Sequence, residues 1–392
     1  MNSNIYILGF SAFSGIGTIR FEQLINEFGT PEKAWNASRT DLKAVLKEAV
    51  GEKFDEFRKE FNLKEYAKEI EKKHIMWFTP NDKEYPKLLK QLNTVIPAEA
   101  GIQSFGLTQD KEDGSRVKPG MTRAPFILFA KGNTDLLKNE KTIGIVGTRK
   151  VTDYGQQVTE MFTKDLVNAG FTIVSGMALG VDGIAHTTAI QHGGKTIAVL
   201  GSGVDIPTPG EHSGLYQQIL EHDGLIVSTF SPGEDANKGS FPARNATVAG
   251  LSQGIVVTEG AEKSGALITA NYAKKFGRPV FSVPGQITSQ LSIGTNNLIK
   301  QGAVPVTAAS GILDTLGIIA EGKSQVPNHK KQKADTKEER IILDLLENGP
   351  LHFDEIVRTI GKDSRSVGSI LSLMELKGVI KSNSKGEYIV TY

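Results

Sequence analysis

The stretch Thr142-Ile-Gly-Ile-Val-Gly-Thr-Arg149 decides the fold of this 392-residue chain. Its apolar run ends at Gly147, and a helical pattern begins near Gly155, so the sequence predicts a strand that enters a helix through a tight turn. Free N–H groups and the helix dipole make the start of such a helix a site for anions, and glycine allows close approach. Arg149 adds a permanent cation whose planar fork matches phosphate oxygens. The stretch therefore predicts a phosphate site.

The same succession of strand, turn and helix recurs after this stretch. Four later runs stop at small or polar residues, namely 171–175 before Gly176, 196–200 before Gly201, 225–228 before Pro232 and 254–258 before Glu259. Such runs, mostly followed by helical segments, indicate an α/β fold with a mainly parallel sheet and helices on both faces. Ligands of these sheets bind at the carboxyl ends of the strands. We expect the glycine-rich turns to line one crevice, although a lone glycine can equally well serve only to turn the chain.

Composition limits the classes of function. With 45 basic and 44 acidic residues the formal net charge is +1, so any contact with nucleic acid must come from a local patch. The chain has no cysteine, which excludes disulfides and thiolate chemistry and fits a reducing compartment. Its first residues lack the pattern of a leader, and no apolar run approaches the ~20 residues that cross a bilayer. We expect a soluble, cytoplasmic protein without a membrane contact.

Distinctive motifs follow one another in the centre of the chain. They are Phe241-Pro-Ala-Arg244-Asn245, Ala249-Gly-Leu-Ser252, Ser264-Gly265-Ala-Leu-Ile-Thr269-Ala, Gly277-Arg278-Pro-Val-Phe281-Ser-Val-Pro284-Gly285 and Asn297-Leu-Ile-Lys-Gln-Gly302-Ala. With the Gly147 turn, Ser175-Gly176 and residues 182–186, they resemble the DNA-processing protein A (DprA or Smf) family. The resemblance implies an extended Rossmann-type core that binds single-stranded DNA, protects it and loads the RecA recombinase in natural transformation. It also implies a homodimer formed through the core.

Lys238, Phe241 and Arg244 bring two cations and an aromatic ring close together in the sequence. A groove for single-stranded DNA needs cations along the phosphates and often an aromatic face on which a base stacks. A turn could aim Arg244 into the crevice beside Arg149, and the family resemblance implies that Lys238 and Arg149 contact DNA. A core aromatic and a solvated lysine are the alternatives. The expected DNA and phosphate site comprises Gly147, Thr148, Arg149, Ser175, Gly176, Gly201, Lys238, Phe241, Arg244, Asn245, Ser264 and Gly265.

Asp182, His186 and Glu259 are the candidates for chemistry near this crevice, because carboxylates and imidazoles act as acids, bases or metal ligands. Asp182 near a helix start is, however, placed to cap that helix. The competing enzyme class resembles phosphoribohydrolases, which carry a catalytic glutamate in a Pro-Gly-Gly-x-Gly-Thr-x-x-Glu motif; Thr269 stands in its place here. We therefore expect no catalytic residue, no metal, no cofactor and no enzymatic activity.

Two further regions precede or interrupt the core, which we place at residues 76–320. Residues 1–75 read as a helical domain in which Ser14-Gly15-Ile16-Gly17 resembles the turn of a helix-hairpin-helix (SAM-like) module that binds DNA phosphate, or else a hairpin that touches nothing. Residues 93–125 look like a translated bacterial repeat element inserted in frame. Glycine, proline and charges without periodicity favour a mobile surface excursion there.

A linker and a small domain complete the chain. Residues 321–336 lack apolar periodicity and predict a linker, and residues 337–392 predict three helices and a β-hairpin, which is the winged-helix pattern. A winged-helix regulator reads DNA with a basic third helix, but residues 364–376 expose mainly Arg365 and serines. A module for a partner or for self-contact is an equal alternative. Of the three classes, recombination mediator, nucleotide enzyme and transcription regulator, we favour the mediator.

Overall fold

The computed structural model describes residues 5–93, 123–318, 334–346, 349–383 and 386–390. It divides into two compact units, Met1–Ile312 and Leu313–Tyr392. The linker predicted at residues 321–336 lies almost wholly outside the described residues. The predicted division of the first unit into a helical domain and a core stays a prediction.

A nine-stranded sheet organises the first unit, with the strands in the order β1-β2-β6-β5-β4-β3-β7-β8-β9. β3 to β9 pair in parallel, while β2 runs antiparallel to β6 and β1 antiparallel to β2. This confirms the predicted α/β class with its mainly parallel sheet. The strands are β1 Met76–Phe78, β2 Leu128–Gly132, β3 Thr142–Val146, β4 Thr172–Ser175, β5 Thr196–Val199, β6 Leu225–Ser228, β7 Ile255–Val257, β8 Val280–Ser282 and β9 Val304–Pro305.

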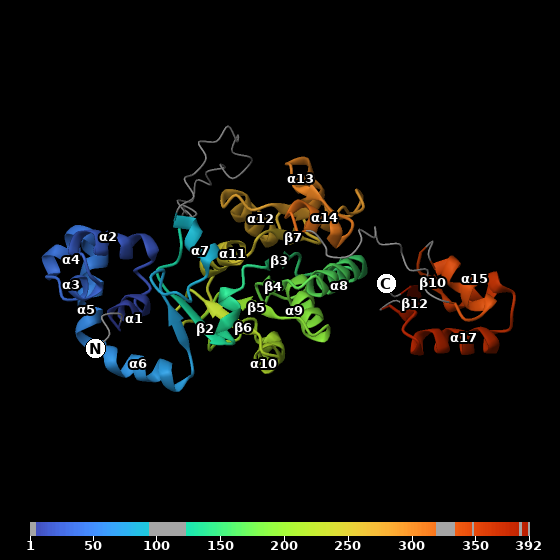
Figure 1. Ribbon diagram of the computed structural model, residues 1–392, viewed down its shortest axis with the longest axis horizontal. Coiled ribbons are helices and arrows are strands. Elements are labelled where there is room, and N and C mark those ends of the chain that lie inside the picture. Colours follow the sequence, from blue (N-terminus) through green and yellow to red (C-terminus); the bar gives the residue numbers. More distant parts are fainter. Residues whose placement is uncertain (1–4, 94–122, 319–333, 347–348, 384–385, 391–392) are drawn as a thin grey trace. The chain divides into compact units, whose positions relative to one another are not determined.

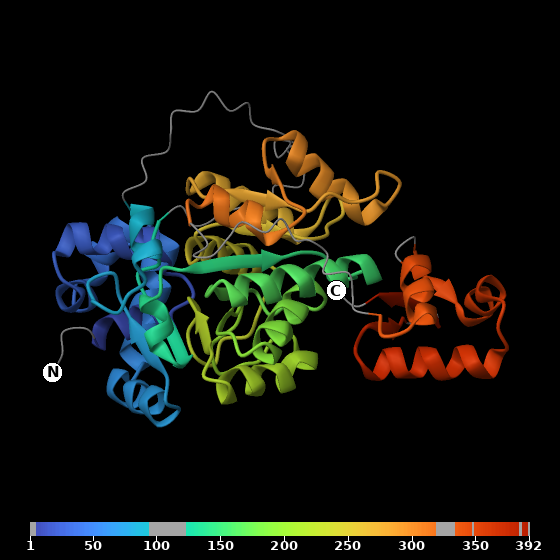
Figure 2. The same ribbon diagram turned by 45° about the vertical axis from the view of Figure 1, so that its right-hand side comes forward.

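Helices cover both faces of this sheet (Figures 1 and 2). Successive residues of a strand point to opposite faces, so Ile197 and Val199 join one apolar cluster while Ala198 and Leu200 join the other. α11 and α12 lie against the first face, and α8, α9 and α10 lie on the second. The helices of this part are α7 Lys87–Lys90, α8 Asp153–Asn168, α9 Val181–Gln191, α10 Ser213–Glu221, α11 Ser240–Gly250, α12 Gly265–Lys275, α13 Ile293–Lys300 and α14 Ala309–Thr315.

The strand order reverses beside β3, which lies between β4 and β7. The chain adds β4, β5 and β6 on one side of β3 and then returns to add β7, β8 and β9 on the other. A reversal of this kind leaves a crevice at the carboxyl ends of the two strands that flank it. The turn after β3, which contains Gly147 to Arg149, therefore lies at the reversal.

Six helices precede the sheet and pack against its second face. Their aromatic side chains form a continuous core, in which Phe10 stacks on Phe54 at a centroid distance of 5.2 Å and Phe57 on Phe61 at 4.6 Å. The same apolar cluster includes Phe129 of β2, so these helices share a core with the sheet. Their bounds are α1 Ile5–Ala12, α2 Thr18–Phe28, α3 Pro31–Trp35, α4 Arg39–Leu46, α5 Glu48–Glu60 and α6 Leu63–Lys72.

The turn from α1 to α2 holds the sequence predicted to resemble a helix-hairpin-helix module. The helix, turn and helix are present, and Ile16 between the two glycines is buried. The Arg20 guanidinium donates to the Gly15 carbonyl at 2.6 Å. Arg20, the cation nearest to this turn in the sequence, is thus bonded to the turn itself. Binding of DNA phosphate by the turn stays a prediction.

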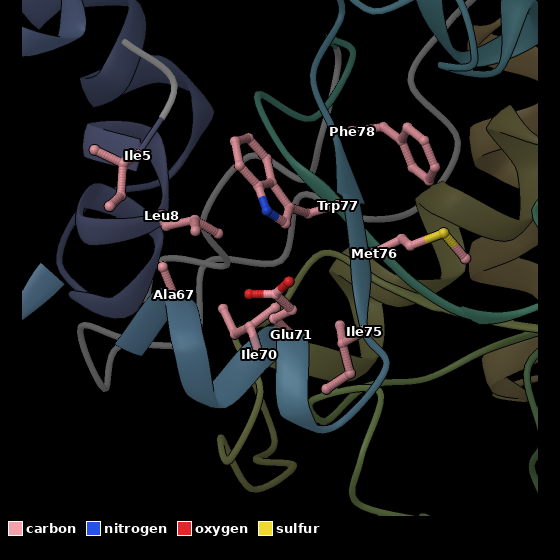
Figure 3. Close-up of a pocket in the computed structure, with 9 residues that line it drawn as sticks. All are labelled: Ile5, Leu8, Ala67, Ile70, Glu71, Ile75, Met76, Trp77 and Phe78. Carbon is pink, nitrogen blue, oxygen red and sulfur yellow. The ribbon is translucent and has the colours of Figure 1, made fainter. Parts of the chain in front are cut away.

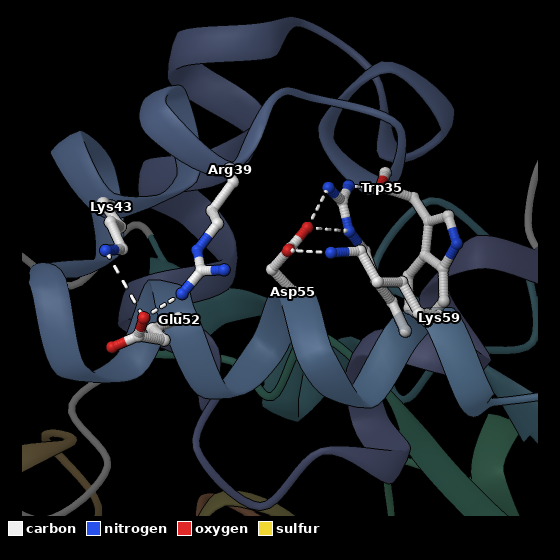
Figure 4. Close-up of polar contacts among 7 residues, drawn as sticks. Trp35, Arg39, Lys43, Glu52, Asp55 and Lys59 are labelled. Atoms are coloured by element: carbon white, nitrogen blue, oxygen red, sulfur yellow. Dashed lines mark hydrogen bonds and ion pairs between the residues drawn. The ribbon is translucent and has the colours of Figure 1, made fainter.

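A buried carboxylate joins two of these helices (Figure 4). Asp55 on α5 is 1% exposed and accepts hydrogen bonds from Lys59 at 2.6 Å and from Arg58 at 3.0 Å. The same Arg58 also donates to the Trp35 carbonyl at the end of α3. The hydrogen bond from Lys59, aided by Arg58, holds the pKa of Asp55 below its ordinary value. This pairing is structural, because every partner belongs to the helical region.

The insertion predicted at residues 93–125 falls mostly on residues 94–122, which lie outside the described residues. Its two ends are described and meet each other. The Asn93 side chain accepts a hydrogen bond from the Ala124 amide at 2.9 Å, and the Pro125 carbonyl accepts one from the Tyr85 hydroxyl at 2.8 Å. The chain therefore returns to the point that it left. Asn93, Ala124 and Pro125, which the prediction included in the insertion, belong to the packed framework.

The second unit forms the predicted winged helix. Its described elements are α15 Lys337–Leu346, β10 Leu351–His352, α16 Phe353–Ile360, α17 Ser364–Leu376, β11 Ile380–Ser382 and β12 Glu387–Val390, and β12 pairs with both other strands. On the third helix, Val367, Leu371 and Met374 are each at most 1% exposed, and Ile370 is half-buried. Gly361 ends α16 at φ +70°, a conformation that glycine adopts without strain.

Candidate nucleic-acid interface

The crevice at the strand reversal gathers an aromatic ring and two arginines. The Arg149 guanidinium lies 5.6 Å from the centroid of the Phe241 ring, and that of Arg244 lies 5.9 Å from the same centroid. Arg149 comes from the turn after β3, whereas Phe241 and Arg244 lie in the first turns of α11. Cations this close to an aromatic ring are stabilised by about 0.5–1 kcal/mol each. The structure therefore unites two motifs that are far apart in the sequence.

The two arginines differ in exposure. Arg149 is exposed, whereas Arg244 is 6% exposed, and Phe241 between them is half-buried. Gly201 after β5 lies directly beside the ring, since a Cβ atom there would be 3.3 Å from Phe241 Cδ1. The ring is consequently neither a core aromatic nor a freely solvated one. The ring therefore has one exposed cation and one buried cation at its sides.

Arg244 is held by hydrogen bonds to backbone and side chain. Its Nη1 donates to the Val199 carbonyl at 3.3 Å, and its Nε donates to Asn245 Oδ1 at 2.9 Å. Gly176 makes room for it, because a Cβ atom at this position would lie 2.4 Å from Arg244 Nη1. Burial lowers the pKa of Arg244, and the nearby Asp182 carboxylate opposes that change. The sequence suggested that Gly176 lets a phosphate approach, and the structure shows that it admits this guanidinium.

Asp182 balances the buried cation from the start of α9. Its carboxylate accepts hydrogen bonds from the amides of Gly176 at 3.1 Å and Ala178 at 3.3 Å, and it is 6% exposed. Burial raises the pKa of Asp182, while Arg244 and the amide donors act in the opposite direction. These contacts make Asp182 a structural anchor for the turn between β4 and α9. The predicted capping role is wrong, because no side-chain hydrogen bond caps α9.

Several expected donors of the phosphate site are already engaged with the protein. The Thr148 amide donates to the Glu259 carbonyl at 2.8 Å, and a Cβ atom at Gly147 would lie 2.5 Å from Val181 Cγ2. The Ser175 hydroxyl, fully buried, donates to the Ile145 carbonyl at 2.6 Å. These residues shape the turns that present Arg149. The Arg149 side chain is left as the exposed donor group of the Gly-Thr-Arg turn.

Asn245, Ser264 and Gly265 connect α11 to α12. The side-chain amide of Asn245 donates to the Gly265 carbonyl at 3.2 Å. The Ser264 hydroxyl caps α12 by accepting from the backbone N–H of Ala266 at 3.3 Å. The amino end of α12, with its positive dipole, is thereby fixed next to the arginine pair. Asn245 thus orients both Arg244 and this helix.

Lys238 lies in the loop that precedes α11 and is exposed. The loop has a fixed shape, because Asn237 Oδ1 accepts from the amides of Gly239 at 2.8 Å and Ser240 at 3.1 Å. Within the described residues, Lys238 forms no ion pair. A cation on a defined loop, three residues before Phe241, is available for an anionic ligand.

The residues weighed for chemistry have structural contacts. Both carboxylate oxygens of Glu259 accept hydrogen bonds from Thr152, one from its amide at 2.9 Å and one from its hydroxyl at 2.7 Å, at the start of α8. Thr269 is 2% exposed. In the described parts of the chain, no three His, Asp or Glu side chains are grouped as metal ligands.

His186 is fully buried in a single tautomer. The Thr196 hydroxyl donates its one proton to the Ile173 carbonyl, so the contact of 2.6 Å between His186 Nδ1 and Thr196 Oγ1 requires Nδ1–H. Its Nε2 has no partner among the described residues. Burial, together with the nearby His212 and Arg244, lowers the pKa of His186 to about 3. The imidazole is therefore neutral.

His212 is a crevice residue that sequence reasoning missed. Its Nδ1 is 2.8 Å from the Met177 carbonyl, so this nitrogen donates to it, and the ring packs on Gly183, where a Cβ atom would be 2.6 Å from Cε1. Met177 has φ +63°, an unusual conformation for a side chain of this size. A lone histidine at the end of the 3-10 helix Gly210–His212 gives no periodic signal that could have revealed this contact.

Comparison with known proteins shows the family of this chain. Residues 106–317 match the model of the family described as DNA recombination-mediator protein A, and residues 326–384 match the DprA winged helix domain. The chain is 36% identical to protein Smf of Synechocystis sp. over 318 residues, which is 80% of this chain and 73% of that protein. The chain therefore belongs to the DNA recombination-mediator protein A family.

Two further relatives share parts of this organisation. The DNA processing protein DprA of Streptococcus pneumoniae is 44% identical over 190 residues, covering 48% of this chain and 66% of that protein. The X-ray structure of DNA processing protein A from the same species matches with a TM-score of 0.62 at 32% identity, over 80% of this chain and 97% of that chain. The names of both relatives describe DNA processing. No helix in the described part of this chain is long and apolar enough to cross a membrane.

Proposed function

We propose that this chain binds single-stranded DNA in the crevice beside β3 and delivers it, in the cytoplasm, to the RecA recombinase. The observation that carries the proposal is the pair of guanidinium groups on the Phe241 ring, one exposed and one buried. Arg149 reaches a phosphate from solvent, while Arg244 supplies a fixed positive charge. A half-buried ring offers a surface on which an unpaired base stacks.

Single-stranded DNA fits this arrangement better than duplex DNA. A base within a duplex is stacked on its neighbours, so it reaches a ring in a crevice only after it has been unpaired and unstacked. The cations contact phosphates and therefore bind without regard to sequence. A mediator that prepares DNA of any sequence for recombination needs this combination.

Binding of RecA and assembly into a dimer complete the proposal. The match to a recombination-mediator family supports both. Ile287 is 90% exposed in the single chain, so a charge placed there tests for a dimer contact without disturbing the buried core. Sedimentation of the Ile287→Asp variant tests the dimer, and RecA filament formation on single-stranded DNA in the presence and absence of the protein tests loading.

The DNA site is tested by mobility shift with single-stranded and duplex DNA over a range of salt concentrations. Arg149→Ala and Lys238→Ala should each weaken binding of single-stranded DNA about five- to tenfold and flatten its salt dependence, because each removes one neutralised phosphate. Lys138→Ala is the matched control, since this exposed lysine ends the 3-10 helix Thr134–Lys138, just before β3 and so at the opposite end of that strand. Unchanged affinity and salt slope in both crevice variants would refute the proposed site.

A further inference from the structure

An apolar groove lies far from the crevice, between α1, α6 and β1 (Figure 3). Its volume is about 460 Å³, within the range of cavities that hold ligands. Ile5 and Leu8 line it from α1, Ala67 and Ile70 from α6, and Trp77 from β1. The Trp77 side chain extends from the strand toward Leu8, so the groove opens beside the strand itself.

β1 is the last strand at its end of the sheet. Its pairing partner is β2, with Trp77 opposite Phe129, and no described strand lies on its other side. The outer edge of such a strand presents N–H and C=O groups that an extended peptide can pair with. Met76, Trp77 and Phe78 of β1 all line the groove, so the groove runs along this strand. The strand edge thus offers main-chain hydrogen bonds to a peptide, and the groove offers a pocket for its side chains.

Two polar groups in the groove indicate the chemistry of the occupant. The Glu71 carboxylate points from α6 into the groove, toward Trp77 (Figure 3). Within the described residues Glu71 forms no ion pair, and the Trp77 indole N–H has no acceptor. A carboxylate beside apolar side chains favours a ligand that brings a cation next to its own apolar groups.

We propose that an extended peptide segment of a partner protein binds here, adding a strand to β1. It places apolar side chains in the groove and a lysine or arginine beside Glu71. A second copy of this chain fits less well, because pairing of two β1 edges would bring two Glu71 carboxylates to one interface. Main-chain pairing also favours a peptide over a small apolar ligand, which would leave the strand edge unpaired.

This surface is independent of the proposed DNA site. In the sheet, β2, β6, β5 and β4 separate β1 from β3, whose turn carries Arg149. A partner bound at β1 would therefore leave the crevice open, and DNA and peptide would bind to the same chain at once. The inference concerns recruitment of the protein and does not depend on the function proposed for the crevice.

The test uses the full chain and fluorescein-labelled peptides in which a central lysine is flanked on both sides by Val, Ile, Leu or Phe. Fluorescence anisotropy measures their binding. Matched peptides carry glutamate in place of the lysine, and a second matched set is N-methylated on alternate backbone nitrogens, so that main-chain pairing is blocked. We expect the lysine peptides to bind more tightly than both matched sets. Absence of binding at millimolar peptide, or equal binding of the N-methylated set, overturns the proposal.

Charge reversal gives the sharper result. Glu71→Lys should weaken binding of the lysine peptides about fivefold and strengthen binding of the glutamate peptides, as the loss of one partly exposed ion pair predicts. Glu69→Lys makes the same change on α6 outside the groove lining and should leave the preference unchanged. An equal effect of Glu71→Lys and Glu69→Lys overturns the role of Glu71. If the protein is a dimer and Trp77→Ala dissociates it, the strand edge binds a second copy of the chain instead. Affinity for single-stranded DNA should stay the same in all three variants.

Discussion

The crevice and the third helix of the winged-helix unit are two surfaces of kinds that commonly bind DNA, and they differ in what they expose. The crevice presents Arg149 beside a half-buried aromatic ring. On α17 the most exposed large apolar side chains are Leu373 and Leu376, at 53% and 85%. A helix that reads DNA needs cations and polar groups toward the groove. The difference supports the proposed DNA site in the crevice over one on α17.

The largest effect that this comparison predicts comes from Arg244→Ala. The change removes the cation that offsets the cost of burying the Asp182 carboxylate. A buried charge left without a partner costs roughly 3 kcal/mol of stability. We expect the free energy of unfolding, measured in urea, to fall by that amount, and the binding of single-stranded DNA to be lost. The double variant Arg244→Ala/Asp182→Asn should recover most of the stability without recovering the affinity. Recovery of both would show that Arg244 does not act on DNA.

The pH dependence of stability tests whether His186 is buried in its neutral form. The pKa of His186 is about 3 when folded and about 6.5 when unfolded, so the unfolded chain binds the proton first. The stability due to its neutral form is complete above pH 6.5 and is lost as the pH falls from there toward 3, amounting to about 2 kcal/mol at pH 5. In His186→Asn, whose amide can still donate to Thr196, this loss between pH 7 and 5 should disappear. Urea titrations at both pH values measure it, and parallel curves for the two proteins would contradict the buried tautomer.

A smaller effect is expected on the third helix. Arg365→Ala removes an exposed arginine at the start of α17. Since that helix exposes leucines rather than a row of cations, we expect less than about a twofold change in affinity for single-stranded DNA. Mobility shifts run beside Arg149→Ala provide the comparison. Equal losses in the two variants would mean that both surfaces share the DNA.

The smallest effect is expected from deletion of residues 96–122. The ends of this segment are held together by the hydrogen bond from the Ala124 amide to Asn93 and by the bond from Tyr85 to Pro125. Shortening a loop whose ends already meet changes the closure entropy only slightly. Melting temperature and affinity for single-stranded DNA should match those of the full chain. A drop of several degrees would show that the deleted residues pack against the framework.

The sequence predicted the elements that depend on local pattern. The runs at 142–146, 172–175 and 225–228 are strands, because continuous β-branched residues are typical of a sheet covered on both faces. The helices and hairpin of the winged-helix unit were predicted with similar success, since apolar residues at helical spacing mark a buried face. The pairing of β1 with β2 was not predicted. A strand of three residues has too short a pattern to be distinguished from a loop.

By itself, then, the sequence determined the α/β class and the family, because periodicity and short motifs are local properties of the chain. The tertiary structure alone decided how the residues around the crevice are used. It placed Arg149 and Arg244 on one ring, buried Arg244 against Gly176, and engaged Ser175 and Thr148 with the protein. Burial and hydrogen-bond partners depend on neighbours that are distant in sequence, and these determine which polar groups remain free for a ligand.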